Sequence, residues 1–143
     1  MRCFLLLTIL LFSSSSLLSQ EEWGSVDKNK LTVKEIAPIW PGCENESKKD
    51  DCFNQQLASH ISKNFKYPAQ AYKKNEQGKV IVEFIINKKG LVEIKKVSGG
   101  TKLLQEEAKR NILSFPKMAK PGMLGGKPTS ISYTVPITFK TGK

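Results

Sequence analysis

Residues 78–100 read GKVIVEFIINKKGLVEIKKVSGG, and this stretch decides the fold. Between residues 80 and 86, alternate side chains make one face of an extended strand wholly apolar, while the other face still carries two isoleucines. We therefore expect a central strand that is largely buried on both faces. Residues 87–90, NKKG, supply turn chemistry, and residues 91–97 return with more charge, which suits an edge strand. The stretch predicts a β-hairpin, which is marginal in water until other elements cover it.

Two helices are predicted before this hairpin. An apolar side chain every four residues indicates a helix that starts near Asp51 or Cys52 and ends before residue 67, with one stripe formed by Phe53, Leu57, Ile61 and Phe65. Pro68 then fits the first turn of a short helix over residues 68–72, where its missing N–H costs nothing.

The C-terminal part of the chain predicts a helix, a loop and a last strand. The helix is expected over residues 102–114, and residues 117–128, with three glycines and two prolines, are expected to form a long loop. Residues 130–140 alternate apolar and polar side chains, which predicts a strand with one buried face. Pro136 lies inside that strand and places it at an edge, because proline cannot donate to a ladder.

These elements combine into an α+β fold. With one central strand and two edge strands, the order is second, first, third, reached by a right-handed crossover through the helix over residues 102–114. The expected architecture is a three-stranded antiparallel sheet with helices on one face. The helix that starts near residue 51 is an additional N-terminal element.

The N-terminus predicts an exported protein. A short basic start, an apolar run and a small-residue segment predict a signal peptide over residues 1–19; the alternative is an uncleaved membrane anchor. Residues 20–50 are expected to be a flexible lead-in with one short strand around residues 31–33, and residues 51–143 are expected to form the domain. Ile39 and Trp40 are candidates to pack on that domain.

Export changes the interpretation of the cysteines. Cys3 leaves with the signal peptide, and Cys43 and Cys52 are most simply one disulfide. A metal site needs more ligands than these, and the single histidine, His60, falls on the polar side of its predicted helix. We therefore expect neither a metal nor a cofactor.

The charge pattern and the polar residues argue against two function classes; an acidic partner or an anionic membrane surface is the open alternative for the basic charge. The net charge is +10, but the lysines are scattered and are not interleaved with aromatic residues, so we expect a solvated basic surface and no nucleic-acid partner. Glu83 and Glu93 lie on facing strands, but two solvated carboxylates are the simpler interpretation, and no nucleophile motif accompanies them. The chain is therefore not expected to be an enzyme. The remaining functional feature is the last strand, whose edge can accept an extended peptide.

An ordered set of short motifs resembles a known family. The set spans residues 65–140 and comprises Tyr67-Pro68-Ala69-x-Ala71, Gly78-Lys79-Val80-x-Val82-x-Phe84, Gly90-x-Val92, Ser98-Gly99-Gly100, the helix from Leu104 to Phe115, and Val135-Pro136-Ile137-x-Phe139. In order and spacing it resembles the C-terminal domain of TonB energy transducers. Upstream, residues 41–44 (PGCE) and 52–53 (CF) resemble TonB-like proteins of the Bacteroidetes type.

The resemblance implies a ββαβ fold, a periplasmic location and a role in TonB-dependent transport. If the N-terminal segment is not cleaved, the alternative that it implies is an inner-membrane anchor that faces the periplasm. The resemblance also implies that the last strand pairs with the TonB box, an extended segment of an outer-membrane receptor. The partner-binding residues that it implies are Ser132, Tyr133, Thr134, Val135, Pro136, Ile137, Thr138 and Phe139.

The N-terminal part departs from the pattern of a complete TonB. The apolar run holds no histidine, and residues 20–37 hold no proline, whereas a complete TonB has a Ser/His anchor motif and a long proline-rich spacer. Fully extended at ~3.5 Å per residue, that lead-in reaches only about 60 Å. We therefore do not expect this chain alone to couple to motor partners of the ExbB/ExbD type. The alternative function is a homodimer or an envelope assembly module joined through the strand edge, with no role in transport.

Overall fold

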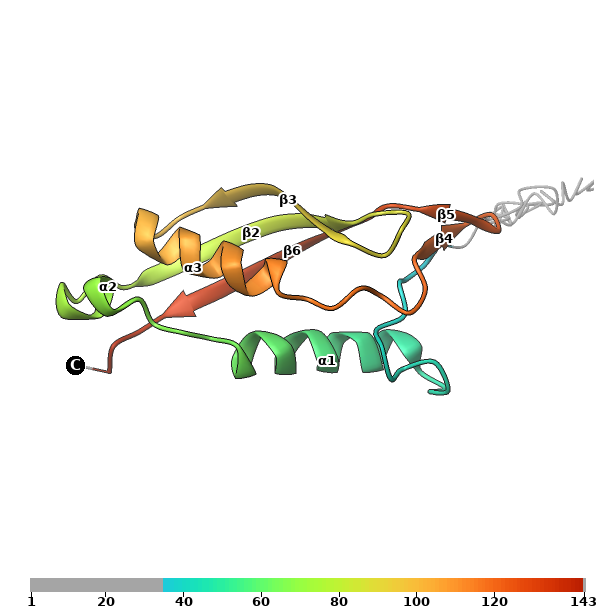
Figure 1. Cartoon of the computed structure of the whole chain (residues 1–143), viewed down its shortest axis with the longest axis horizontal. Helices are drawn as coiled ribbons and strands as arrows, with labels where there is room; N and C mark the ends of the chain where they lie inside the picture. The colour runs from blue at the N-terminus through green and yellow to red at the C-terminus, as the bar shows by residue number, and fades with distance from the viewer. Residues whose placement is uncertain (1–34, 143) are drawn as a thin grey trace, which may run out of the picture. The chain divides into compact units, whose positions relative to one another are not determined.

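A computed structural model of the chain describes residues 35–142 (Figure 1). Its elements run in the order β1 (Glu35–Ile36), α1 (Lys49–Lys63), α2 (Ala69–Lys73), β2 (Gly78–Ile86), β3 (Val92–Ser98), α3 (Lys102–Leu113), β4 (Gly122–Leu124), β5 (Lys127–Thr129) and β6 (Ile131–Phe139). The expected signal peptide over residues 1–19 and the strand expected around residues 31–33 lie outside the described residues. Among the helices of residues 35–142, none has the length and apolar character needed to cross a bilayer.

The larger sheet has three antiparallel strands in the order β3-β2-β6, which is the order expected from the sequence. β2 pairs with β6 in one continuous register, from Gly78 opposite Phe139 to Ile86 opposite Ile131. The pairing of β2 with β3 is interrupted by a register shift after Glu83. In Figure 1, α3 lies across β2 and α1 runs alongside β6, and buried side chains of both helices share one core with the sheet. The α+β fold class is therefore confirmed.

A second, smaller sheet corrects the expected long loop. Residues 117–128 do not form one loop, because β4 and β5 make a hairpin in this region, and β1 pairs with β4 to give the order β1-β4-β5. The turn between β4 and β5 consists of Gly125 and Gly126, with φ of 58° and 76°. Two consecutive residues of positive φ match the twist of a tight hairpin. The glycines thus mark a two-residue turn and not a long connection.

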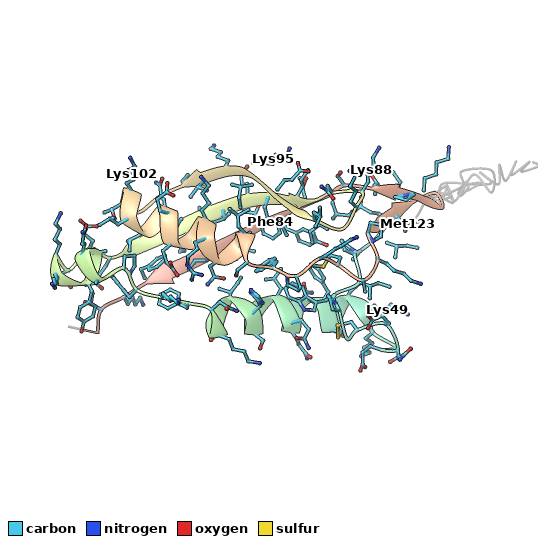
Figure 2. All side chains as sticks on the ribbon, viewed as in Figure 1. Lys49, Phe84, Lys88, Lys95, Lys102 and Met123 are labelled. Atoms are coloured by element: carbon cyan, nitrogen blue, oxygen red, sulfur yellow. A yellow bond between two sulfur atoms is a disulfide. The ribbon has the colours of Figure 1, made fainter. Side chains whose placement is uncertain are left out.

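The core lies between the larger sheet and the helices. On β2, the side chains that point to the helices are fully buried, and Figure 2 shows Phe84 among them; they are Val80, Val82, Phe84 and Ile86. Helix α3 contributes Leu104, Ala108 and Ile112, and α1 contributes Phe53. The outer side chains of β2, Ile81 and Ile85, are only partly buried, so the outer face is less covered than the sequence suggested.

Helix α1 begins at Lys49, slightly before the expected start. Asp50 and Asp51 occupy its first turn, where carboxylates favour a helix N-terminus through the helix dipole. The segment before it packs in the same core, because Ile39, Trp40 and Cys43 are buried upstream of the domain start expected at residue 51.

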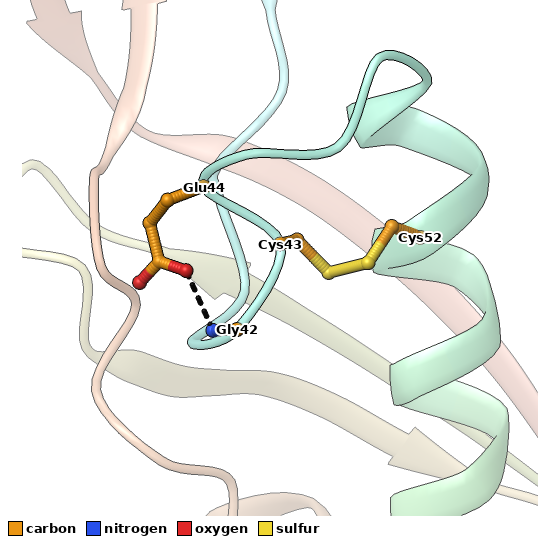
Figure 3. Close-up of a disulfide and its surroundings, with 4 residues drawn as sticks. All are labelled: Gly42, Cys43, Glu44 and Cys52. Atoms are coloured by element: carbon orange, nitrogen blue, oxygen red, sulfur yellow. Dashed lines mark hydrogen bonds between the residues drawn. A yellow bond between two sulfur atoms is a disulfide. The ribbon is translucent and has the colours of Figure 1, made fainter.

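The expected disulfide between Cys43 and Cys52 is confirmed (Figure 3). The two Cα atoms lie 5.9 Å apart, and Cys43 is completely buried. Next to it, the backbone N–H of Gly42 donates to Glu44 Oε2 at 2.8 Å. The bond therefore ties the segment that carries Trp40 to the first turns of α1.

His60 is half-buried and not fully solvated, which corrects the expectation from the sequence. Its ring centroid is 5.0 Å from that of Phe115 and 5.8 Å from that of Trp40, and Nε2 lies 2.9 Å from Ser114 Oγ. Burial of the ring lowers the pKa of His60 below its usual 6.5, because the charged form loses hydration. The period of the helix alone could not show that Trp40 and Phe115 cover this residue.

Removing the disulfide with Cys43→Ala and Cys52→Ala together is expected to lower the free energy of unfolding by about 2–3 kcal/mol, because a short loop gains freedom in the unfolded chain. Urea denaturation followed by tryptophan fluorescence measures the change. An unchanged unfolding free energy would show that the segment from residue 38 to 43 is held by packing alone.

Acidification from pH 7 to pH 5 is expected to lower the free energy of unfolding through His60. Its pKa is depressed in the folded state, so the unfolded chain binds the proton more readily and the stability present above pH 6.5 is lost as the pH falls. His60→Gln should flatten this part of the profile. Because the chain has one histidine, NMR titration gives its pKa directly, and a midpoint at or above 6.5 contradicts the account.

Candidate functional site

Strand β6 contains every residue that the sequence analysis assigned to partner binding. Its side chains divide into two sets that alternate along the strand. One set points to the helices and is buried or half-buried, and consists of Tyr133, Val135, Ile137 and Phe139. The other set is exposed on the outer face, and consists of Ser132, Thr134, Pro136 and Thr138. The structure places these residues on one edge strand, and their role in binding stays a prediction.

The hydrogen-bond pattern of the hairpin shows which backbone groups of β6 face outward. The N–H of Asn87 donates to the carbonyl of Leu91 at 2.8 Å, so Asn87 points its backbone groups at β3. Because backbone groups alternate in direction along an antiparallel strand, Ile86 points its own groups at β6, where it pairs with Ile131. The odd-numbered residues of β6 therefore bond to β2.

The even-numbered residues of β6 point their backbone groups away from the sheet. The N–H groups of Ser132, Thr134 and Thr138 face this side, and so do their carbonyls and that of Pro136. Within residues 35–142, no backbone or side-chain hydrogen bond joins these groups to another segment. This row of unpaired groups is the free edge of β6.

Pro136 occupies a position that does not weaken the sheet. It lies opposite Ile81, and its nitrogen points to the free edge, so β2 loses no partner. The alternation of the backbone thus explains why an edge strand can contain this proline. The free edge keeps a carbonyl acceptor at Pro136 and lacks a donor there.

The opposite edge of the sheet is less suited to pairing. On β3, Lys95 is an extra residue between Ile94, which faces Phe84, and Lys96, which faces Glu83. Such a bulge bends the strand, and lysines on an edge resist pairing with another chain. Figure 2 shows Lys88 and Lys95 directed outward on this side of the molecule. Of the two edges, only that of β6 is regular in register.

The residues around β6 pack against it through aromatic contacts, and Tyr133 is an ionisable residue of the strand itself. The Tyr133 ring stacks on Phe53 and Phe84, with centroids 5.1 Å and 5.6 Å away. Burial raises the pKa of Tyr133 to about 12, with smaller contributions from Asp50 and Glu35, so the phenol is neutral.

The two strand carboxylates do not form a pair. Glu83 lies opposite Lys96, and Glu93 lies opposite Ile85. Glu93 also accepts a hydrogen bond from Asn87 Nδ2 at 2.7 Å. In the described part of the chain, no three potential metal-ligand side chains gather.

A groove lies beside the free edge, and the sequence analysis missed it. It is lined by Ile61, Ser62 and Phe65, at and after the end of α1, and by Pro136, Ile137 and Thr138 of β6. Its volume is about 330 Å³. We call it the edge groove. The helical stripe put Ile61 and Phe65 on one face, but no signal in the sequence placed that face next to Pro136.

Amide hydrogen exchange should alternate along β6. The N–H groups of Tyr133, Val135 and Ile137 bond to β2 and are expected to exchange at least about tenfold more slowly than those of Ser132, Thr134 and Thr138. NMR-detected exchange of the free protein measures these rates residue by residue. Uniformly slow exchange along β6 would mean that another segment already covers the edge.

A family model matches the part of the chain that holds the larger sheet. The family model described as "Gram-negative bacterial TonB protein C-terminal" matches residues 63–141, which is more than half of the chain. A search of curated proteins found no match.

Two solution structures of the Helicobacter pylori TonB C-terminal domain are similar to the chain. The longer is 25% identical, with a TM-score of 0.45, and covers 63% of this chain and 81% of that one. The shorter is 24% identical, with a TM-score of 0.43, and covers 64% and 96%. The family match across residues 63–141 confirms the resemblance found in the sequence. The chain therefore belongs to the TonB C-terminal domain family, and is a TonB-like protein linked to TonB-dependent transport.

Proposed function

We propose that this protein binds the TonB box of an outer-membrane receptor in the periplasm, and that the TonB box adds to the sheet as a strand beside β6. The observation that supports this proposal is the free edge of β6, where Ser132, Thr134 and Thr138 direct unpaired N–H groups outward. An extended peptide satisfies such groups with its own backbone. Each net hydrogen bond contributes about 0.5–1.5 kcal/mol, so a few of them give a weak and reversible complex.

Three features of the fold suit the edge to this task. β2 pairs with β6 along its whole length, so the edge strand is ordered before a partner binds. The other edge is bulged and carries lysines, which directs a partner to β6. The end of β6 is fixed, because Thr141 donates its backbone N–H to Gln77 and its hydroxyl to Asn75.

A second copy of the chain is the alternative partner, because an open edge accepts any extended strand. Pairing of β6 with another β6 brings Pro136 from both chains into one ladder and loses a donor on each side. A receptor segment without proline loses only one. Sedimentation at several protein concentrations separates the two, and a concentration-dependent dimer would favour the second copy.

Titration with a TonB-box peptide is expected to shift the amide signals of residues 132–139 other than Pro136, and to slow the exchange of the Ser132 and Thr134 amides. Thr134→Pro should weaken binding about fivefold or more, because it removes one outward donor while the bonds to β2 remain. Thr134→Ala is the matched control, since it removes the side chain and keeps the N–H.

Two results would refute the proposal. The peptide binds without shifting any amide signal of residues 132–139, or it does not bind at all. Equal binding by Thr134→Pro and Thr134→Ala would show that side chains and not backbone groups of β6 hold the peptide. Both variants are first checked for an unchanged amide spectrum outside β6.

A further inference from the structure

We infer that the edge groove is a pocket that binds the side chain of one apolar residue in the strand added to β6. This inference rests on the proposed function and goes beyond it, because it says what the partner must carry and where. The groove is lined by the side chains of Ile61 and Phe65 and by Pro136 to Thr138 on the edge strand itself. An added strand would therefore lie directly along one wall of the groove.

The alternation of side chains decides which residue of the partner enters the groove. On β6, Ile137 points to the helix side and is buried, whereas Pro136 and Thr138 point to the outer face. Residues that face each other across neighbouring strands project to the same side of a sheet. The partner residue beside Ile137 therefore points to the helix side, between Ile137 and the end of α1.

The groove compensates for the weakest point of the edge. Pro136 offers no N–H, so an added strand gains one hydrogen bond fewer there than at Thr134. Burial of an apolar side chain next to it supplies free energy at the same place. It also fixes the register, because a slip by one residue would turn that side chain to the opposite face.

The helix wall of the groove is held in place by polar contacts from α3. Asn111 Nδ2 donates to the carbonyl of Ile61 at 2.9 Å, and Arg110 Nη2 donates to the carbonyl of Asn64 at 2.7 Å. Glu107 Oε1 accepts the backbone N–H of Lys66 at 3.0 Å. These bonds surround Ile61 and Phe65 in the chain, so the wall is formed before a partner binds and its ordering costs little on binding.

The charges around the groove indicate that the partner carries a carboxylate next to its apolar residue. Lys79 lies opposite Thr138 on the outer face, and Lys140 follows the end of β6. The ion pairs within residues 35–142 join Glu93 to Lys95 and Glu107 to Arg110, and neither Lys79 nor Lys140 takes part. The partner is thus an extended segment that places an apolar side chain in the groove and a carboxylate nearby on the outer face.

Filling the groove tests the inference. Ser62 is exposed and lines the groove, so Ser62→Trp is expected to occupy it without removing core atoms, and to weaken binding of a TonB-box peptide about five- to tenfold. Gln56→Trp is the matched control, because it adds the same ring to an exposed position of α1 that does not line the groove. Circular dichroism and the amide spectrum show whether each variant keeps the fold.

An alanine scan of the peptide identifies the residue that enters the groove. Alanine at one apolar position of the peptide should weaken binding to the wild-type protein about five- to tenfold. The same peptide change should hardly weaken binding to Ser62→Trp any further, because both changes remove the same contact. Magnetisation transfer from that side chain to the methyl groups of Ile61 and Ile137 is expected. Lys79→Gln should lower affinity about two- to threefold at low salt and not at high salt.

The outcomes separate this inference from the proposed function. If the peptide slows exchange at Ser132 and Thr134 while Ser62→Trp and Gln56→Trp bind it equally well, the groove has no role and strand addition stands. If no peptide adds to β6, both fail. Contacts from residues 20–34 or from a second copy to Ile61 and Ile137 in the free protein would show that the chain fills its own groove, which also overturns the inference.

Discussion

The constraint on which the structure depends is the use of both edges of β2. β2 bonds to β3 on one side and to β6 on the other, and its even-numbered residues direct their backbone groups to β6. The same residues direct their side chains to the helices, so burial and hydrogen bonding fix one register together. A shift by one residue would expose the apolar face of β2. The backbone groups of Ser132 and Thr134 in β6 point outward because of this register, whatever their side chains are.

The elements around the sheet leave the backbone groups of the free edge of β6 unpaired and place the end of α1 beside them. Aromatic contacts hold α1 and the segment after it against β6: the ring centroids of Phe53 and Tyr133 are 5.1 Å apart, and those of Phe65 and Phe139 are 5.0 Å apart. The disulfide fixes the first turns of α1, and α3 fixes its end through Asn111. Because α1 is tied at both ends, the edge groove beside Pro136 has a stable wall. The fold thus presents backbone groups and an apolar pocket along the same strand.

Much of the fold could be predicted because its signals are local. The alternation in residues 80–86 and the four-residue stripe through Phe53 indicated elements that the structure contains, and Pro136 indicated an edge strand. Other features could not be predicted, because they depend on contacts between residues that are distant in sequence. His60 is covered by Trp40 and Phe115, and the edge groove joins α1 to β6, so neither could be seen in any single segment. The Gly125-Gly126 turn was a local signal, but its glycines were interpreted as a long loop.

The most direct test of the central claim is the measurement of scalar couplings across hydrogen bonds between labelled protein and labelled TonB-box peptide. The account predicts couplings from the amide nitrogens of Ser132 and Thr134 to carbonyl carbons of the peptide, with the amides of Tyr133 and Val135 still coupled to β2. Couplings from the peptide to β3, or a bound peptide with no coupling to β6, would contradict it.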